Sequence, residues 1–342
     1  MAGIKCVIWD LDNTLWEGVL TEGGAEALRP GAEALVRELD RRGIVQSVAS
    51  KNDAKAAMQR LECFGLADYF LCPQISWNPK SQGVQAILDT LNIKQEAAAF
   101  LDDSAFERDE VRFALPRVRC YDPADLSALA DGPEFQVRFI TEDAARRRLM
   151  YRADIDRQAA ERAFEGNADD FLATLHMKLD VAPVTEKDLR RVEELTVRTH
   201  QLNATGHTYS YEELLALSSD PRWIFRICGL TDDYGDSGKV GLLLLEDLGD
   251  TLAVRLLIVS CRVMSRGIGA ALLSYATALA ARLGKKLVAE YVETEYNRIM
   301  YITYKLAGFE ELEEDGDMVL LGYGHDAPLP FPDYLELRET ER

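Results

Sequence analysis

Several features that mark particular classes of protein are missing from this sequence. No apolar run approaches the roughly 20 residues that span a bilayer. The first apolar stretch, Cys6 to Trp9, meets Asp10 and Asp12 before it could form the core of a signal peptide. The six cysteines include no C-x-x-C pair, so neither a zinc site nor a disulfide framework is indicated. We therefore expect a cytoplasmic protein without a membrane segment.

Basic residues and histidines are also scarce. The chain has 39 Lys and Arg against 58 Asp and Glu, a net charge of −19, and four His. Such a charge repels a phosphate backbone, and no basic run contains interleaved aromatic residues, so we do not expect nucleic acid as a partner. With 47% hydrophobic residues, the 342 residues are instead typical of a globular protein, and their number suggests two domains.

Hydrophobic patterning divides the chain into four parts. In residues 1–135, short apolar β-rich runs alternate with helical patterns, which is typical of βαβ units around a parallel sheet. Residues 136–177 are predicted to form a charged helical connector. Residues 178–325 combine helices with strands of a largely antiparallel sheet, and residues 326–342 follow as a C-terminal tail. The expected fold class is α/β in both halves.

Two aspartates follow the first β-run, in the segment from Asp10 to Trp16. They lie past the carboxyl end of a strand, which is where α/β sheets bind ligands. In an aspartyl-phosphate mechanism, Asp10 attacks phosphorus, while Asp12 protonates the leaving oxygen and then activates water. Mg²⁺ would hold the phosphoryl group and offset its charge. On this motif alone, a pair of surface aspartates that caps a turn remains an alternative.

Further polar residues follow the later strands in the order that this mechanism needs. Ser50 can bind a phosphoryl oxygen or cap the next helix, Lys80 can neutralise the phosphate and Asp10, and two later aspartates supply the carboxylates that Mg²⁺ prefers. The predicted phosphatase site has Asp10 and Asp12 as catalytic residues, Asp10, Asp12, Asp102 and Asp103 as metal ligands, and Thr14, Ser50, Lys51, Asn52 and Lys80 as phosphate-binding residues.

These four elements in this order resemble the four motifs of the haloacid dehalogenase (HAD) superfamily, over residues 5–125. The resemblance implies a Rossmann-like parallel sheet and a Mg²⁺-dependent phosphatase. The intervals from Thr14 to Ser50 and from Ser50 to Lys80 are too short for a large cap domain, so we expect an open site. An open site suits a phosphate carried on a protein or on a long arm.

A glycine-rich turn links a strand to a helix in the C-terminal half. Backbone N–H groups around Gly267 and Gly269 can cradle a pyrophosphate at the start of the helix. With Asn297, Tyr304 and Phe309 further along, this region resembles the GCN5-related N-acetyltransferase (GNAT) fold, whose members bind the pantetheine of coenzyme A there. The Arg or Gln that is usual three residues before Gly267 is a methionine in this chain.

A resemblance to one family, the FkbH-like proteins, covers nearly the whole chain. It rests on the motifs DLDNTLWEGVL, SKND, WNPK, LDDSAFERDEVR, ITEDAARRRLMY and SCRVMSRGIG. Members of this family are glyceryl transferase/phosphatases of polyketide assembly lines. The resemblance implies that the glyceryl unit of 1,3-bisphosphoglycerate is loaded onto the phosphopantetheine thiol of an acyl carrier protein, with loss of both phosphates.

The acyl phosphate and the phosphomonoester of this substrate need different chemistry, so we expect two sites. Cys261 is the best candidate for an enzyme thiol, although a buried structural thiol is the alternative and the carrier's own thiol could attack instead. His200 or His207 could act as its base. The expected acyl- or pantetheine-binding residues are Gln201, Asn203, Arg262, Arg266, Gly267, Gly269, Asn297 and Tyr304.

Docking of an acidic carrier protein would need a basic patch. The arginines of the connector, Arg146, Arg147, Arg148 and Arg152, are candidates, and a solvated helix face is the alternative. Three other functions also stay open. The chain could be a phosphatase of a carrier-bound or small substrate whose second half only binds phosphopantetheine, acetyl-CoA or a partner; a combined phosphatase and acetyltransferase; or an adaptor without activity.

Overall fold

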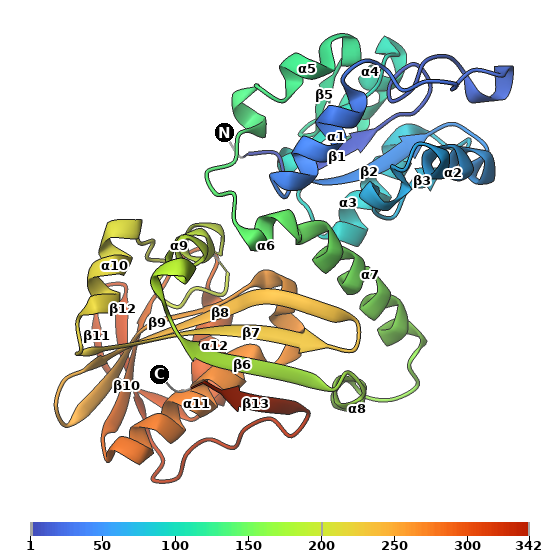
Figure 1. Ribbon diagram of the computed structural model, residues 1–342. Helices are drawn as coiled ribbons and strands as arrows, with labels where there is room; N and C mark the ends of the chain where they lie inside the picture. Colours follow the sequence, from blue (N-terminus) through green and yellow to red (C-terminus); the bar gives the residue numbers. More distant parts are fainter. Residues whose placement is uncertain (1–2, 200, 341–342) are drawn as a thin grey trace. The chain divides into compact units, whose positions relative to one another are not determined.

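Two compact units, Met1–Gln158 and Ala159–Arg342, make up the chain (Figure 1). The computed structural model describes residues 3–199 and 201–340. Each unit has its own sheet, with helices packed on both faces. Within these described ranges, no helix is both long enough and apolar enough to cross a membrane.

The first unit is built on a five-stranded sheet in which every neighbouring pair of strands is parallel. A parallel sheet is covered on both faces, and the three central strands are accordingly buried along their whole length. In spatial order the strands are β3 (Gln74–Ile75), β2 (Val45–Ser50), β1 (Cys6–Trp9), β4 (Ala98–Leu101) and β5 (Arg119–Tyr121).

Two pairs of helices cover this sheet. Apolar residues of α1 (Ala32–Arg41) and α2 (Ala54–Cys63) pack on one face, and those of α3 (Lys80–Leu91) and α4 (Ala105–Ala114) on the other. The connections contain only η1 (Leu20–Glu22), η2 (Ala67–Tyr69), η3 (Gln95–Ala97), η4 (Pro123–Asp125), α5 (Leu126–Leu129) and η5 (Pro133–Phe135). The described part of this unit therefore contains no large cap domain, as the sequence predicts.

The predicted connector is helical and is divided between the two units. It contains α6 (Glu142–Ala145), α7 (Arg147–Ala163) and α8 (Ala168–Thr174).

Three of the arginines expected to form a docking patch are used inside the first unit. Arg147 Nη1 donates to the carbonyl oxygen of Gly43 (3.1 Å), and Arg148 Nε lies 2.9 Å from Asp40 Oδ1. Arg152 Nη1 lies 3.1 Å from a carboxylate oxygen of Asp68. These contacts hold the start of α7 to the first unit. The guanidinium groups of these three arginines are therefore engaged within the first unit.

The second unit contains an eight-stranded mixed sheet. Neighbouring strands are antiparallel except for the pairs β10/β9 and β6/β13, which are parallel. The spatial order is β11 (Phe309–Asp315), β12 (Met318–Tyr323), β10 (Lys286–Val292), β9 (Thr251–Val259), β8 (Gly235–Asp247), β7 (Trp223–Asp232), β6 (Met177–Pro183) and β13 (Leu335–Glu339). Strand β13 comes from residues 326–342, which therefore complete the sheet instead of forming a separate tail.

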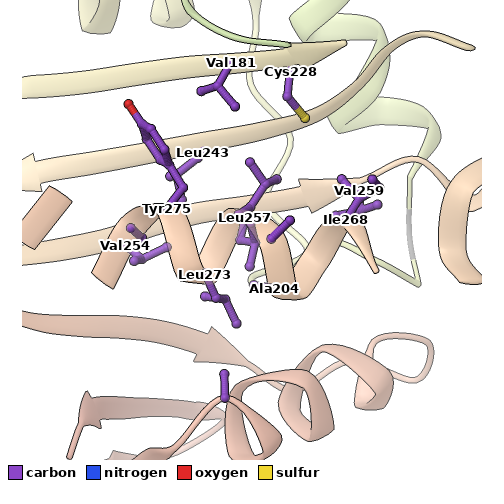
Figure 2. Packing of buried hydrophobic residues seen from close by; sticks show 14 of the residues in the cluster. Val181, Ala204, Cys228, Leu243, Val254, Leu257, Val259, Ile268, Leu273 and Tyr275 are labelled. Carbon is purple, nitrogen blue, oxygen red and sulfur yellow. The ribbon is translucent and has the colours of Figure 1, made fainter. Parts of the chain in front are cut away.

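Helices on both faces give this unit its core. Apolar residues of α11 (Ile268–Leu283) and α12 (Arg298–Leu306) pack on one face, and those of α9 (Leu189–Arg198) and α10 (Tyr211–Ser219) on the other. Figure 2 shows Val254 and Leu257 of β9 beside Ile268 and Tyr275 of α11. Two short turns, η6 (Glu186–Asp188) and η7 (Cys261–Arg266), precede α9 and α11.

Candidate active site

A lysine lies between two buried carboxylates at the carboxyl edge of the first sheet. Lys80 Nζ is 2.8 Å from Asp10 Oδ1 and 2.6 Å from Asp102 Oδ2, and all three side chains are at least nine-tenths buried. Asp10 follows β1, Asp102 follows β4, and Lys80 begins α3. Because β1 and β4 are adjacent parallel strands, their ends bring the two carboxylates together, as the sequence predicts.

The protonation of Asp10 depends on this burial. Burial raises the pKa of Asp10 from 3.8 to about 7; the charge of Lys80 opposes this rise, and the charge of Asp102 adds to it. Burial also raises the pKa of Asp102, again against the effect of Lys80. One ammonium group thus faces two carboxylates. A bound cation would add positive charge and favour the ionised form of Asp10, which is the form that a nucleophile needs.

Three carboxylates are suitably arranged for a metal ion. One oxygen each from Asp10, Asp102 and Asp103 lies within 4.8 Å of the other two. Thr14 orients Asp103, because its Oγ1 accepts from the Asp103 amide (3.0 Å) and donates to Asp103 Oδ1 (3.4 Å). An all-oxygen donor set with excess negative charge fits Mg²⁺, so these three aspartates would hold the ion. Thr14, expected to bind phosphate, is a positioning residue for this cluster.

The side chain of Asp12, which the sequence also predicts as a metal ligand, is not among the three carboxylates of this cluster. Its Oδ1 accepts from Trp16 Nε1 (2.8 Å) and from the amide of Leu20 (3.0 Å), and its Oδ2 accepts from Asn52 Nδ2 (2.9 Å). These three donors fix the carboxyl group of Asp12, two residues after Asp10. The arrangement leaves Asp12 for the proton transfers that the sequence also predicts.

The three residues after β2 diverge, although all were predicted to bind phosphate. The side chain of Ser50 hydrogen-bonds Asp10, whereas Lys51 Nζ lies 2.8 Å from Glu107 Oε1 and Asn52 reaches Asp12. Lys51 and Asn52 are therefore tied to neighbouring side chains. The sequence alone indicates no role for Glu107, which lies in the segment LDDSAFERDEVR.

In the second unit, a chain segment bridges the two strands beside the glycine-rich turn. Strands β9 and β10 pair only over Thr251–Val254 and Lys286–Ala289. Beyond that pairing, Ala204 N donates to Leu257 O (3.1 Å) and Val259 N to Leu202 O (2.9 Å), while Val292 N donates to Ala204 O (3.1 Å). Residues 202–204 thus use backbone groups of both strands, and Figure 2 shows Ala204 near Leu257.

Asn297 and Asn203 hold this segment in place. Asn297 is completely buried, and its Nδ2 donates to the carbonyl oxygens of Asn203 (3.0 Å) and Val292 (2.9 Å). Its Oδ1 accepts from the Thr294 amide (2.9 Å) and from Tyr291 Oη (3.1 Å). Asn203 Oδ1 in turn accepts from the amides of the next turn. Both side chains were predicted to bind the acyl group or pantetheine, but their polar atoms are used within the unit.

The glycine-rich turn is covered by the chain's own C-terminal segment. Gly267 has a φ of 71°, and a Cβ atom placed there would lie 2.1 Å from Tyr334 Oη. Arg266 is buried and points to Ser237 Oγ (3.0 Å) and Asp232 (3.5 Å), and Arg262 Nη2 donates to the Ser237 carbonyl oxygen (3.2 Å). The two arginines, predicted to bind an acyl or pantetheine group, thus contact the β7–β8 hairpin.

The remaining predicted residues of this half lie in different surroundings. Tyr304 is completely buried, its hydroxyl has no hydrogen-bond partner within the described ranges, and burial raises its pKa well above the usual range. This environment disfavours its role as a proton donor to a ligand. Gly269 lies inside α11, Gln201 is exposed, and Cys261 is half-buried. His200 lies outside the described residues.

The raised pKa of Asp10 makes stability depend on pH. Its contribution to the free energy of unfolding is fully present below pH 3.8 and is lost as the pH rises through about 7. In the presence of EDTA, we expect the difference in this free energy between the wild type and Asp10→Asn to fall over that interval. Urea denaturation at a series of pH values measures it. A difference that does not change with pH would contradict the assignment.

The chain's own residues 202–204 and Tyr334 occupy the region beside β9 and the glycine-rich turn. We therefore expect weak or absent binding of coenzyme A. Residues 202–204 use the backbone groups of β9, and Tyr334 covers Gly267. We expect isothermal titration of the intact chain with coenzyme A to give no saturable signal at about 1 mM ligand, a concentration that detects binding of about −4 kcal/mol. Tyr334→Ala alone should not restore binding, because the segment still bridges the strands. Saturable binding to the wild type would show that the segment moves aside.

Comparison with known proteins finds a hydrolase family in the first half of the chain. The model of the haloacid dehalogenase-like hydrolase family matches residues 19–107. Among solved structures, the N-terminal part of BF1531 from Bacteroides fragilis, which contains a phosphatase domain complexed with Mg, is similar at 31% identity and a TM-score of 0.35. That match covers 39% of this chain and 40% of the Bacteroides chain. No curated protein matches the chain.

Two N-acetyltransferases are also similar in structure. The ribosomal-protein-S18-alanine N-acetyltransferase from Escherichia coli has 15% identity and a TM-score of 0.35, with 44% of this chain and 94% of that one covered. The PaiA N-acetyltransferase from Thermoplasma acidophilum, in complex with coenzyme A, has 17% identity and a TM-score of 0.36, with 43% and 99% covered. The expected α/β fold class is confirmed, because each half of the chain contains a sheet with helices, and the haloacid dehalogenase-like match lies in the first half.

Proposed function

We propose that this chain is a Mg²⁺-dependent glyceryl transferase/phosphatase. It removes phosphate from a phosphoglyceryl group derived from 1,3-bisphosphoglycerate, and it loads the glyceryl group as a thioester on an acyl carrier protein. The observation that carries the phosphatase activity is the buried contact of Lys80 with Asp10 and Asp102. The transfer activity rests on the motifs that resemble the FkbH-like family.

Each residue at the end of β1 has a separate task in phosphate removal. An Asp10 carboxylate oxygen attacks phosphorus, the bond to the leaving oxygen breaks, and Asp12 gives that oxygen a proton. Asp12 then takes a proton from water, which attacks the aspartyl phosphate and regenerates Asp10. Lys80 holds the nucleophile in place and offsets the phosphoryl charge. When bound, Mg²⁺ would stabilise charge on the phosphoryl oxygens, held by the aspartate cluster described above.

The surroundings of this site favour a substrate carried by a large partner. The described part of the first unit contributes no cap domain, and Asp103 is exposed. Two large apolar side chains beside the site are also exposed: Trp77, three residues before Lys80, at 69%, and Phe106, three residues after Asp103, at 73%. Aromatic residues are enriched where protein surfaces contact one another. A phosphoryl group on the arm of a carrier protein suits such a site.

Acyl transfer needs a thiol, and two sources are compatible with the chain. Attack of a thiolate on the acyl phosphate forms a thioester and releases phosphate. Cys261 is half-buried at the start of η7, two residues after the end of β9, and could accept the glyceryl group first. The carrier's own phosphopantetheine thiol could instead attack directly, which would make Cys261 dispensable.

A second candidate function follows from the chain segments that occupy the expected pantetheine site of the second unit. Residues 202–204 and Tyr334 lie where the sequence predicted pantetheine binding. This observation favours a phosphatase of a carrier-bound or small phosphorylated substrate, in which the second unit takes no part in acyl transfer. The two candidates differ in whether the carrier gains mass.

Intact mass spectrometry of the carrier separates these functions. After incubation of phosphopantetheinylated carrier with the protein, MgCl₂ and 1,3-bisphosphoglycerate, we expect a mass increase of one glyceryl group without phosphate. With Asp10→Asn, we expect at least a 100-fold slower loss of the remaining phosphate, because the covalent step is removed. Release of phosphate with no carrier adduct would leave the second candidate.

The same assay tests the enzyme thiol. If Cys261 accepts the glyceryl group, Cys261→Ser lowers the rate of carrier loading at least 100-fold, while hydrolysis of a small phosphate ester stays within about twofold of the wild type. Cys63→Ser, which replaces an exposed cysteine of the first unit, is the matched control. Full-rate loading by Cys261→Ser would assign the attack to the carrier thiol.

A further inference from the structure

One buried polar atom beside the proposed proton donor has no partner. Asn52 is 2% exposed at the end of β2, and its Nδ2 donates to Asp12 Oδ2 (2.9 Å). Its Oδ1 is completely buried, yet within the described ranges no hydrogen-bond donor reaches it. A buried acceptor without a donor costs on the order of 1–3 kcal/mol, so a donor from outside the chain would be favoured there.

The orientation of this amide follows from its neighbour. Asp12 Oδ1 accepts from Trp16 and from the Leu20 amide, and its Oδ2 faces the Asn52 amide. Turning the Asn52 amide around would set its oxygen against a carboxylate oxygen and lose the hydrogen bond. The unpartnered atom is therefore an acceptor and calls for a donor such as a hydroxyl group.

The position of this acceptor relates it to the substrate. The oxygen and nitrogen of an amide are bonded to one carbon, so Asn52 Oδ1 lies beside the carboxyl group that, in the proposed function, protonates the leaving oxygen. With the leaving oxygen held at Asp12, substrate atoms one or two bonds beyond that oxygen would lie nearest to Oδ1. A hydroxyl on the carbon next to the phosphorylated carbon would supply the missing donor.

We propose that Asn52 is a specificity-determining residue of the phosphatase site: its Oδ1 accepts a hydrogen bond from a substrate hydroxyl adjacent to the phosphate ester. The inference rests on the proposed function and narrows its substrate class to phosphate monoesters with a vicinal hydroxyl. A site built to bind a hydroxyl discriminates strongly against an analogue that lacks it, since the acceptor then stays unpaired.

The test compares two substrates that differ in one oxygen. These are the 3-phosphoglyceryl and 3-(phosphooxy)propanoyl thioesters of pantetheine, and the second lacks only the 2-hydroxyl group. For the wild type we expect kcat/KM to be about 10 to 100 times higher with the hydroxylated ester. Asn52→Ala should bring this ratio close to one, with most of the loss on the hydroxylated ester.

Two further variants separate recognition from the positioning of Asp12. Trp16→Phe removes another donor to Asp12 and should slow both esters by the same factor, leaving the ratio unchanged. Asn52→Asp keeps an acceptor at this place while setting a carboxylate against Asp12, so it should retain the preference at a lower rate. Circular dichroism of each variant checks that the fold is kept.

The outcomes are distinguishable. A ratio that stays high in Asn52→Ala would overturn the inference and assign the acceptor to water alone. Equal hydrolysis of both esters by the wild type would also overturn it and leave the proposed phosphatase in place. Hydrolysis of neither ester, while p-nitrophenyl phosphate is cleaved, would contradict the proposed substrate and with it this inference.

Discussion

The site of the first unit depends on the ammonium group of Lys80, which lies between the carboxylates of Asp10 and Asp102. Without it, two buried carboxylates would face each other in a medium that screens charge poorly, and an uncompensated buried charge is strongly destabilising. The contact exists because β1 and β4 are adjacent and because α3 begins at Lys80. The strand order and the start of this helix are thus tied to the chemistry, and the remaining negative charge explains why a divalent cation fits.

The second unit uses its buried polar groups differently. Asn297, Asn203 and Arg266 have the residue types of a ligand site, but they bind the chain's own carbonyl, amide and side-chain groups. The hydrogen bonds of residues 202–204 to both β9 and β10 satisfy backbone groups that the limited pairing of these strands leaves open. These three polar residues therefore serve the internal structure of the second unit. The chemistry assigned from side-chain geometry lies in the first unit.

The sequence predicted what depends on periodicity and strand ends. The place of Asp10, Lys80 and Asp102 at one edge of the sheet was predicted from the rule that parallel strands present their carboxyl ends at one edge. Both sheets were predicted from the alternation of apolar runs. It did not predict side-chain directions: Ser50, Lys51 and Asn52 are consecutive, yet they contact three different partners. Nor did it predict contacts between distant segments, such as Tyr334 over Gly267, because no local pattern specifies them. Trp16 lies in the motif DLDNTLWEGVL, but no sequence pattern indicates that its indole donates to Asp12.

Chemical trapping shows whether Asp10 is the covalent nucleophile of the proposed phosphatase. The protein is mixed with substrate and MgCl₂, quenched in acid and treated with sodium borohydride, which reduces an aspartyl phosphate to homoserine. Peptide mass spectrometry then locates the reduced residue. We predict homoserine at position 10, only when substrate is present, and none at positions 12, 102 or 103. Reduction at one of those positions, or turnover with no reduced aspartate under conditions that trap a known aspartyl phosphate, would contradict the account.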